Sequence, residues 1–375
     1  MKKAFRTTLT AIATLTAIAT LTAIAFGNNA FANDDPFVQE AKQLVAAATA
    51  KQEKWDGPTT GPQLQKEKTV IFIASDMKNG GVLGVIDGMK EAVGVTGWKL
   101  DVLDGAGTVN NQLAALNQAI ARKPDAIVIG GWNPNVAKIP LQKATKNGIK
   151  LAAWHATPEP GAIDKYGIFY NVTSDSDEIA RLSAMLAVAE SNGKAKAIIL
   201  TDSLYEIALR KANVMKEVIE KCKECKVLEF IDTPLADTSS RMPNLTFSLL
   251  QKYGDDLEYA LAINDLYFDF MAPSLRTAGK DKPFSISAGD GSVTAYQRIR
   301  NGDKQFATVP EPLNLHGWQL VDELNRAFAN EKPSGYITPA HLVTKENVAF
   351  DGGENNLYAP QNGYKGAYKA IWGVK

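Results

Sequence analysis

The sequence predicts an α/β protein made of two Rossmann-like lobes, each built on a parallel sheet covered by helices. From residue 69 onward, short apolar runs rich in β-branched residues alternate with longer amphipathic stretches, which is the pattern of consecutive βαβ units. This alternation occurs in two successive series. The chain of 375 residues also exceeds the length that one hydrophobic core usually serves. Two lobes in sequence order are therefore expected.

The first residues have the pattern of an export signal. Lys2, Lys3 and Arg6 precede an uncharged stretch at residues 7–26, and Ala30-Phe31-Ala32 supplies an A-x-A cleavage pattern. A transmembrane anchor is the alternative, but threonines dilute the stretch and the cleavage pattern ends it. We expect cleavage after Ala32, with no cysteine nearby to receive a lipid. The protein that remains is then soluble and periplasmic.

Residues 33–65 differ in composition from the rest of the chain. Residues 34–54 are rich in Ala, Gln, Glu and Lys with a loose helical period, and residues 55–62 then bring two Gly-Pro pairs. Because glycine and proline end helices and favour turns, we expect a helical lead-in followed by a rigid connector.

The two series supply the strands and helices of the lobes. In the first series the expected strands are residues 70–74, 100–103, 126–129, 151–153 and 168–170, with helices at 84–93, 111–122 and 136–147. In the second they are 197–200, 227–231, 259–263, 284–287 and 307–309, with helices at 181–190, 208–221 and 295–301. Nearly continuous apolar strands are typical of sheets buried on both faces, so helices should cover each sheet on both sides.

The charge balance argues against nucleic acid or an anionic membrane as a partner. The chain has 41 basic and 41 acidic residues, and loss of Lys2, Lys3 and Arg6 leaves 38 against 41, a formal charge of −3. Binding to a polyanion requires an excess of positive charge, which is absent here. No stretch after residue 32 is apolar for long enough to span a bilayer.

Cys222 and Cys225 are the only cysteines and form a C-x-x-C pattern. A redox pair or half of a zinc site is the alternative, but no second cysteine pair exists and the chain has only three histidines. In an oxidising periplasm a local structural disulfide is the favoured interpretation, and its short loop should stabilise the protein little. We expect no metal site and no cofactor.

Several short motifs recur in the order and spacing of one family. They are Val70 to Ser75, Leu103-Asp104, Lys123 to Ile129, Ser174-Asp175, Asn264-Asp265, Ala278-Gly279-Lys280 and Gly289-Asp290-Gly291. Over roughly residues 66–345 the chain therefore resembles the pentose and hexose branch of the periplasmic binding proteins, the ribose-binding type.

This resemblance implies the type I periplasmic binding protein fold, in which a hinge of three segments joins the lobes. The crossings would lie near residues 173–176, 309–312 and 338–341. The N-terminal lobe would comprise residues 66–174 and 311–339, and the C-terminal lobe residues 175–310 and 340–375. The implied function is that of a monomeric receptor that closes on a sugar or polyol and delivers it to an ABC transporter permease. The open alternative is a ligand receptor for chemotaxis or a sensor kinase, which would bind a small signalling molecule or another polar metabolite.

In an open parallel sheet the ligand crevice lies beyond the carboxyl ends of the strands. This rule selects the residues that follow each apolar run, among them Asn79 after the first strand. Trp132 and Trp154 follow two neighbouring strands, and each is either a core residue or a face on which a sugar ring stacks.

The resemblance, carried over position by position, implies six ligand-binding residues. They are Asn133, His155, Arg210, Asn264, Asp290 and Glu311. Arg210 and Asp290 together could satisfy the acceptor and donor sides of a hydroxyl ligand, or could form a salt bridge that merely closes the cleft. Asn264 is expected to contact the ligand and Asp265 to cap the following helix, although both could belong to a helix cap. Asp175 is expected to cap a helix rather than bind calcium.

Other classes of function lack support in the sequence. An enzyme would need a nucleophile with its base or a metal cluster, and neither pattern is present; no G-x-S-x-G occurs. A gene regulator with the same two lobes would begin with a DNA-binding helix-turn-helix, and the export signal argues against it. We therefore expect a binding protein and not an enzyme.

Overall fold

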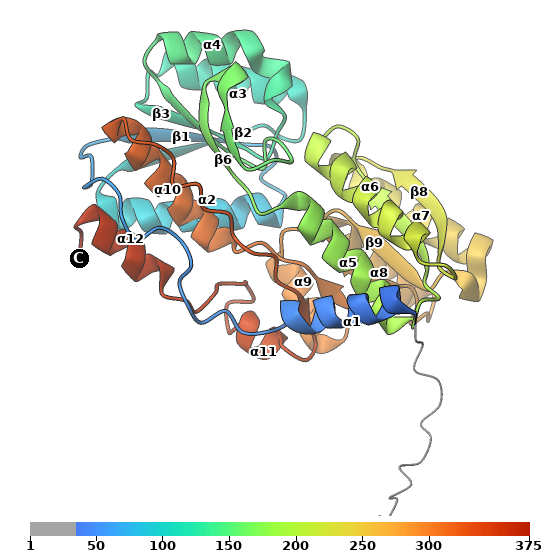
Figure 1. Ribbon diagram of the computed structural model, residues 1–375. Helices are drawn as coiled ribbons and strands as arrows, with labels where there is room; N and C mark the ends of the chain where they lie inside the picture. Colours follow the sequence, from blue (N-terminus) through green and yellow to red (C-terminus); the bar gives the residue numbers. More distant parts are fainter. Residues whose placement is uncertain (1–34) are drawn as a thin grey trace, which may run out of the picture. The chain divides into compact units, whose positions relative to one another are not determined.

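The computed structural model describes residues 35–375. The predicted export signal and its cleavage site lie outside these residues. Within them, two sheets of six mostly parallel strands are flanked by helices, which is the predicted two-lobed fold (Figure 1). Among residues 35–375, no helix combines the length and the apolarity needed to cross a membrane.

The first lobe is built on the sheet β2-β1-β3-β4-β6-β5. Its strands are β1 (Thr69–Ala74), β2 (Lys99–Asp104), β3 (Ala126–Gly130), β4 (Lys150–Trp154), β5 (Gly161–Ile163) and β6 (Ile168–Val172). The connecting helices are α2 (Gly80–Thr96), α3 (Val109–Ala121), η1 (Pro134–Ala137), α4 (Lys138–Lys146) and η2 (Asp164–Tyr166). Only β5 runs antiparallel to its neighbour. Ala74 pairs with Gly130, and Gly130 with Trp154, so these strands end at the same edge.

The second lobe is built on the sheet β12-β11-β10-β9-β7-β8. Its strands are β7 (Lys196–Thr201), β8 (Lys226–Asp232), β9 (Tyr259–Ala262), β10 (Phe284–Ser287), β11 (Ala307–Thr308) and β12 (Val343–Thr344). Its helices are α5 (Ser176–Glu190), α6 (Glu206–Lys221), η3 (Leu235–Asp237), α7 (Thr238–Tyr253), η4 (Gly254–Asp256), α8 (Leu266–Thr277), α9 (Val293–Asn301) and α11 (Val348–Asp351). Only β12 is antiparallel. Asp175 caps α5 by accepting from the backbone N–H groups of Asp177 and Glu178, as predicted.

All ten strands expected from the sequence are confirmed to within two residues at each end. Their continuous apolar runs become the centres of the two sheets, where both faces are covered. The short edge strands β5 and β12 were not expected, because neither carries an apolar run long enough to stand out. The helix α10 (Leu313–Ala329) was also not expected, since polar residues interrupt its apolar pattern.

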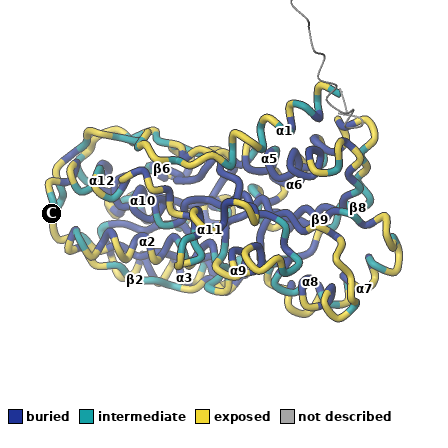
Figure 2. Tube along the Cα trace, turned by 90° about the horizontal axis from the view of Figure 1, so that it is seen from below, coloured by how far each residue is buried: buried dark blue, intermediate teal, exposed yellow. Residues whose placement is uncertain are grey.

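α10 lies in the first lobe against α2, β4 and β6, and it is buried along almost its whole length (Figure 2). Its polar side chains do not face solvent but hold irregular parts of the chain. Arg326 bonds to Asp322 and to the carbonyl of Thr60, and Asn325 holds the connector through Pro62 and Gln65. Other residues of α10 hold the segment at 334–338 and the last helix. Buried polar groups need such partners.

The three expected crossings between the lobes are present, and two further crossings accompany them. α1 (Pro36–Ala48) packs on α5 of the second lobe, whereas the connector after it packs on the first lobe. Gln52 bonds to Tyr358 of the second lobe, and only three residues later Trp55 packs on Tyr336 and Tyr368.

The expected assignment of residues 340–375 to the second lobe is wrong for the last helix. α12 (Tyr364–Trp372) packs on α10, and Trp372 stacks on Trp318 with ring centroids 5.6 Å apart. The large apolar face of α12 belongs to the core of the first lobe, together with Val70 and Phe72 of β1. The segment between α11 and α12 is therefore the fifth crossing.

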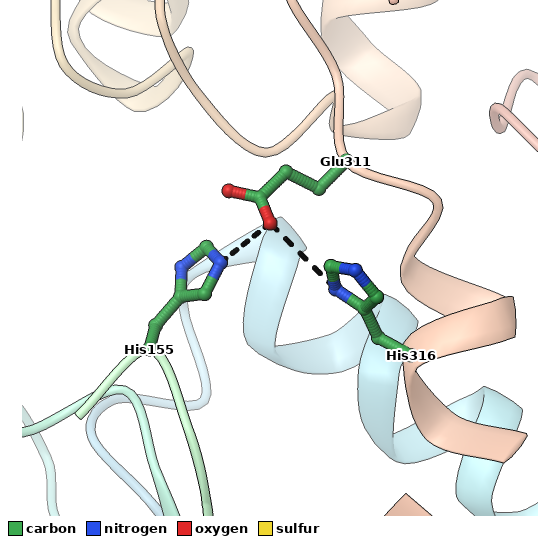
Figure 3. Close-up of side chains that lie close together, drawn as sticks. All are labelled: His155, Glu311 and His316. Atoms are coloured by element: carbon green, nitrogen blue, oxygen red, sulfur yellow. Dashed lines mark hydrogen bonds and ion pairs between the residues drawn. The ribbon is translucent and has the colours of Figure 1, made fainter. Parts of the chain in front are cut away.

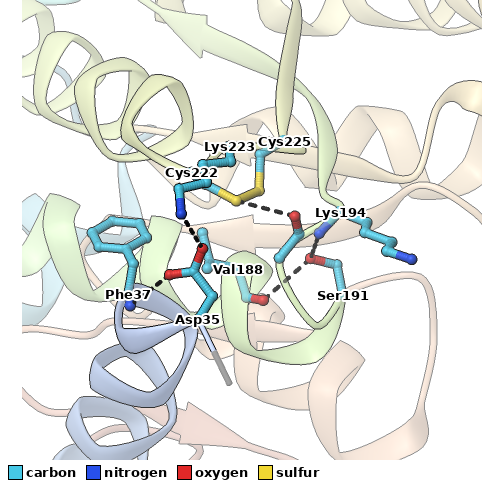
Figure 4. The surroundings of a disulfide bond; sticks show 9 residues. Asp35, Phe37, Val188, Ser191, Lys194, Cys222, Lys223 and Cys225 are labelled. Atoms are coloured by element: carbon cyan, nitrogen blue, oxygen red, sulfur yellow. Dashed lines mark hydrogen bonds and ion pairs between the residues drawn. A yellow bond between two sulfur atoms is a disulfide. The ribbon is translucent and has the colours of Figure 1, made fainter. Parts of the chain in front are cut away.

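The disulfide joins Cys222 at the end of α6 to Cys225, just before β8 (Figure 4). Its Cα atoms lie 5.2 Å apart. Asp35, which caps α1 by accepting from the N–H of Phe37, lies beside it and pairs with Lys223 at 3.5 Å. The disulfide thus fixes the turn against which the lead-in helix begins.

Candidate ligand-binding site

A cavity lies between the lobes at the carboxyl ends of both sheets, where the strand-end rule places it. Its open space is about 60 Å³, whereas ligand pockets usually measure roughly 300 to 1,000 Å³. The lobes must therefore part before a ligand can enter this cavity. The polar and aromatic side chains that line it are Ser75, Asp76, Asn79, Trp154, His155, Tyr205, Lys211, Asn264 and Asp290.

The first lobe contributes the ends of β1 and β4. Asn79 begins α2 and accepts a hydrogen bond from the N–H of Gly81, so its carbonyl oxygen is engaged as a helix cap. His155 follows β4 with a positive φ of 48°, a conformation that few residues other than glycine adopt. Its ring stacks on Trp154 with centroids 3.9 Å apart and planes 12° apart. This conformation turns the imidazole toward the second lobe.

The second lobe contributes α6 and the ends of β9 and β10. Lys211 lies one turn into α6 and is buried, and its only hydrogen bond among the described residues is a long one of 3.5 Å to Oε1 of Glu311. Asn264 donates from Nδ2 to Oδ2 of Asp290 at 2.7 Å and accepts from the N–H of Leu266. Asp290 Oδ1 lies 4.0 Å from His155 Nδ1 across the cleft.

Glu311 is buried in the crossing between β11 and α10, next to His155 and His316 (Figure 3). It contacts two residues that line the cavity, His155 and Lys211. His155 donates from Nε2 to Glu311 Oε2 at 2.6 Å, and the N–H of Ser174 donates to the same oxygen at 3.3 Å. Burial would raise the pKa of Glu311, but the positive charges of His155 and Lys211 hold it well below its ordinary value. Glu311 is thus a buried carboxylate that is fully compensated.

His155, Glu311 and His316 have the residue types of a metal site, and their ligand atoms lie within 4.8 Å of one another. Both ring nitrogens of His316 are engaged, however. Trp154 donates from Nε1 to His316 Nδ1 at 3.1 Å, and His316 Nε2 bonds to Thr338. The ammonium of Lys211 would also repel a cation. The cluster is therefore better suited to holding the cleft wall than to holding a metal ion.

Asp290 and Asp265 are both buried carboxylates, but only Asp290 lines the cavity, whereas Asp265 accepts hydrogen bonds from neighbouring parts of the second lobe. Burial raises the pKa of Asp290, and the charges of His155 and Lys211 partly offset this. Burial raises the pKa of Asp265 to about 6, against hydrogen bonds from Gln305 and the charge of Arg298. Asp265 accepts from the N–H of Gly291 and from Gln305, so it supports the loop that carries Asp290. The expectation that Asp265 caps α8 is wrong.

A family model for the periplasmic binding protein domain matches residues 70–332. The chain belongs to this family. The family is made of solute-binding proteins, and the match covers most of both lobes. Among curated proteins, no sequence matches the chain.

Solved structures of similar fold support the same architecture. A sugar ABC transporter subunit from Rhodobacter sphaeroides is 22% identical, with a TM-score of 0.63 over 75% of this chain and 99% of its own. A solute-binding protein from Mycobacterium smegmatis with bound glycerol is 20% identical, with a TM-score of 0.67 over 78% and 99%. One from Agrobacterium vitis with bound α-D-tagatopyranose is 17% identical, with a TM-score of 0.68 over 78% and 100%.

In this periplasmic binding protein, five of the nine residues expected at the site line the cavity: Asn79, Trp154, His155, Asn264 and Asp290. Four lie elsewhere. Trp132 is a core residue whose Nε1 donates to the carbonyl of Ile73, and Asn133 caps η1. Glu311 stands behind His155 and Lys211, and Arg210 faces solvent.

The placement of Arg210 corrects the most specific expectation. Its side chain is 52% exposed and forms a bidentate ion pair with Asp177, so it pairs with neither Asp290 nor the cavity. The next residue, Lys211, occupies the cleft instead. One residue turns a helix by about 100°, and Lys211 shares the inward face of α6 with Ala208, Ala212 and Met215. A lysine on that apolar face was the signal that could have identified it.

Tyr205 also lines the cavity and was not among the nine expected residues. It precedes α6 and packs against the apolar clusters of both lobes. Burial raises the pKa of its phenol. Its aromatic type after a strand was a usable signal, but the resemblance did not point to this position.

Proposed function

We propose that this protein is the periplasmic receptor of an ABC importer and captures a small hydroxyl-rich ligand, a sugar or a polyol, by closure of its lobes. The observation that carries the proposal is the unused hydrogen-bonding capacity of the cavity. Asp290 keeps acceptor sites and Lys211 keeps donor sites, and both are buried. A hydroxyl donates and accepts at once, so a polyhydroxylated ligand satisfies both.

The charge of the cavity supports a neutral ligand. Among its lining residues and their direct partners, the buried carboxylates of Asp290 and Glu311 already face the ammonium of Lys211 and the N–H groups of His155. A ligand with a net charge would leave one buried group uncompensated, which is costly. The bound glycerol and tagatose of the two similar structures are neutral molecules of this class.

A thermal-shift screen of the protein against sugars, polyols, sugar acids, nucleosides and amino acids tests the proposal. A compound at a hundred times its dissociation constant adds about 2.7 kcal/mol of stability. We expect shifts from neutral sugars or polyols and none from sugar acids.

The Asp290→Ala variant is the control, since loss of one charge-assisted bond of about 1.5 to 3 kcal/mol should weaken binding at least tenfold. Shifts that are confined to amino acids or nucleosides, or that persist unchanged in Asp290→Ala, would contradict the assignment.

A further inference from the structure

The lobes touch directly where α2 begins. A Cβ atom on Gly81 would lie 2.2 Å from Oδ2 and 2.4 Å from Cβ of Asp290, and one on Gly80 would lie 2.7 Å from Cβ of Ser292. Neither glycine has a positive φ, so the backbone conformation does not require glycine here. The requirement is steric, and it comes from the loop of the other lobe.

Other glycines of α2 show that this requirement is local. Gly88 faces α10 inside the first lobe, where a Cβ atom would lie 2.4 Å from the carbonyl oxygen of Asn314. Gly94 is exposed, and a Cβ atom there would meet nothing within 4 Å. One helix therefore carries glycines that serve contact between lobes, packing within a lobe, and no contact at all.

The contact separates two cavities. The inner one is the ligand-binding cavity, and the outer one, of about 460 Å³, is lined by Gly80 and Ser292 themselves. Both are also lined by Asn264 and Leu266. Parting α2 from the loop at residues 290–292 would join the two spaces and open the ligand-binding cavity to the outer one.

We propose that Gly80 and Gly81 are the closure contact of the cleft, and that the absence of side chains at these positions sets how far the lobes can close. Asp290 then has two tasks, because the same side chain that lines the ligand cavity also rests on Gly81. A methyl group at position 80 or 81 raises the free energy of the closed state, and ligand affinity falls by the factor by which the closed population falls. The part of this proposal that concerns affinity rests on the proposed function; the steric contact does not.

The test is the Gly80→Ala variant with a compensating change on the other lobe. Ser292→Gly removes the atom that the new methyl group would strike, and glycine is itself tolerated at a helix N-cap, so the loss of the Ser292 cap of α9 weakens the protein little. Spin labels on Ile139→Cys of α4 and Phe247→Cys of α7, both exposed, report lobe separation without any ligand. We expect Gly80→Ala to lose the shortest label distances of the wild type and Gly80→Ala/Ser292→Gly to recover them.

Titration with glycerol and with D-tagatose gives the second readout. Gly80→Ala should weaken binding at least tenfold, and the double variant should return to within about threefold of the wild type. Gly94→Ala is the matched control, the same substitution in the same helix, and should behave as the wild type. If neither compound binds but the label distances change as stated, the closure contact stands and the ligand class falls. Three results would overturn the proposal. The label distances could be identical in the wild type and Gly80→Ala, Ser292→Gly could fail to relieve the defect, or Gly94→Ala could show an equal change.

Discussion

The cleft and the polar face of α10 both bury charged side chains, but they leave them in different states. In the cleft, Asp290 and Lys211 retain free acceptor and donor sites. On α10, the donors and acceptors of Arg326 and Asn325 are already hydrogen-bonded to Asp322 and to the backbone of the connector. Burial of polar groups alone therefore does not mark a binding site. Buried groups with unfilled bonding capacity do.

The polar side chains of α10 also account for the two additional crossings between the lobes. The connector before β1 and the helix α12 lie outside the residues that the family model matches, yet α10 supplies polar partners for both. They are held in place as part of the first lobe, while α1 is held on the second. The two lobes are thus joined by the three hinge segments and also by the chain between Gln52 and Trp55 and the chain between α11 and α12.

The largest expected effect is on α10. Arg326→Ala leaves the buried carboxylate of Asp322 without its ion-pair partner and the carbonyl of Thr60 without its donor. Breaking a buried pair in this way costs about 3 to 5 kcal/mol. Urea unfolding should show this loss, while the affinity of the folded protein for its ligand changes less than twofold. A large loss of affinity at unchanged stability would instead place α10 in the binding machinery.

His316 lies at the boundary between the two regions and provides the pH test. Burial lowers its pKa from 6.5 to about 4, so the neutral imidazole accepts from Trp154. The unfolded chain binds more protons between these values, so the stability that His316 contributes is complete above pH 6.5 and is lost as pH falls toward 4. His316→Asn keeps an acceptor but cannot ionise.

The free energy of unfolding, measured for wild type and His316→Asn by urea titration at pH 7 and pH 5, decides this prediction. The advantage of the wild type over the variant should shrink by about 2 kcal/mol between these pH values. A difference that is constant with pH would mean that His316 is not held neutral by burial.

Much of the fold could be predicted from the sequence, because short continuous apolar runs that alternate with amphipathic stretches indicate strands buried on both faces. The strand ends then indicated where the cavity lies. Asn79 and Trp154 came from that rule, whereas His155, Asn264 and Asp290 came from the resemblance. The other site residues could not be predicted, because the position of a strand end does not show in which direction the following side chains point. Trp132 and Trp154 both follow strands, but the indole N–H of Trp132 bonds to the carbonyl of Ile73 in the core, whereas Trp154 carries His155 in the cleft. Arg210 and Lys211 are adjacent in sequence and lie on different faces of α6.

Lys211→Met tests whether the inward face of α6 carries the ligand contact. The variant keeps the length and apolar contacts of the side chain and removes its donors, while Glu311 retains His155 as a partner. Loss of one charge-assisted bond should weaken binding about tenfold or more. Calorimetric titration with the best compound of the screen measures the affinity, and Lys211→Arg is the companion variant that keeps the charge. Affinity within twofold of the wild type in Lys211→Met would remove Lys211 from the site.

The smallest effect is expected for the neighbouring residue. Arg210→Ala removes an ion pair whose two side chains are 52% and 43% exposed, and exposed pairs of this kind contribute about 0 to 1 kcal/mol because solvent screens both charges. Affinity should therefore match the wild type, and the unfolding midpoint should move only slightly. Raising the salt concentration should erase even that difference, since screening weakens an exposed pair and leaves a buried contact almost unchanged. A tenfold loss of affinity in Arg210→Ala that persists at high salt would mean that the side chain leaves Asp177 and enters the cleft when ligand binds, and the division of α6 into a ligand face and a solvent face would then fail.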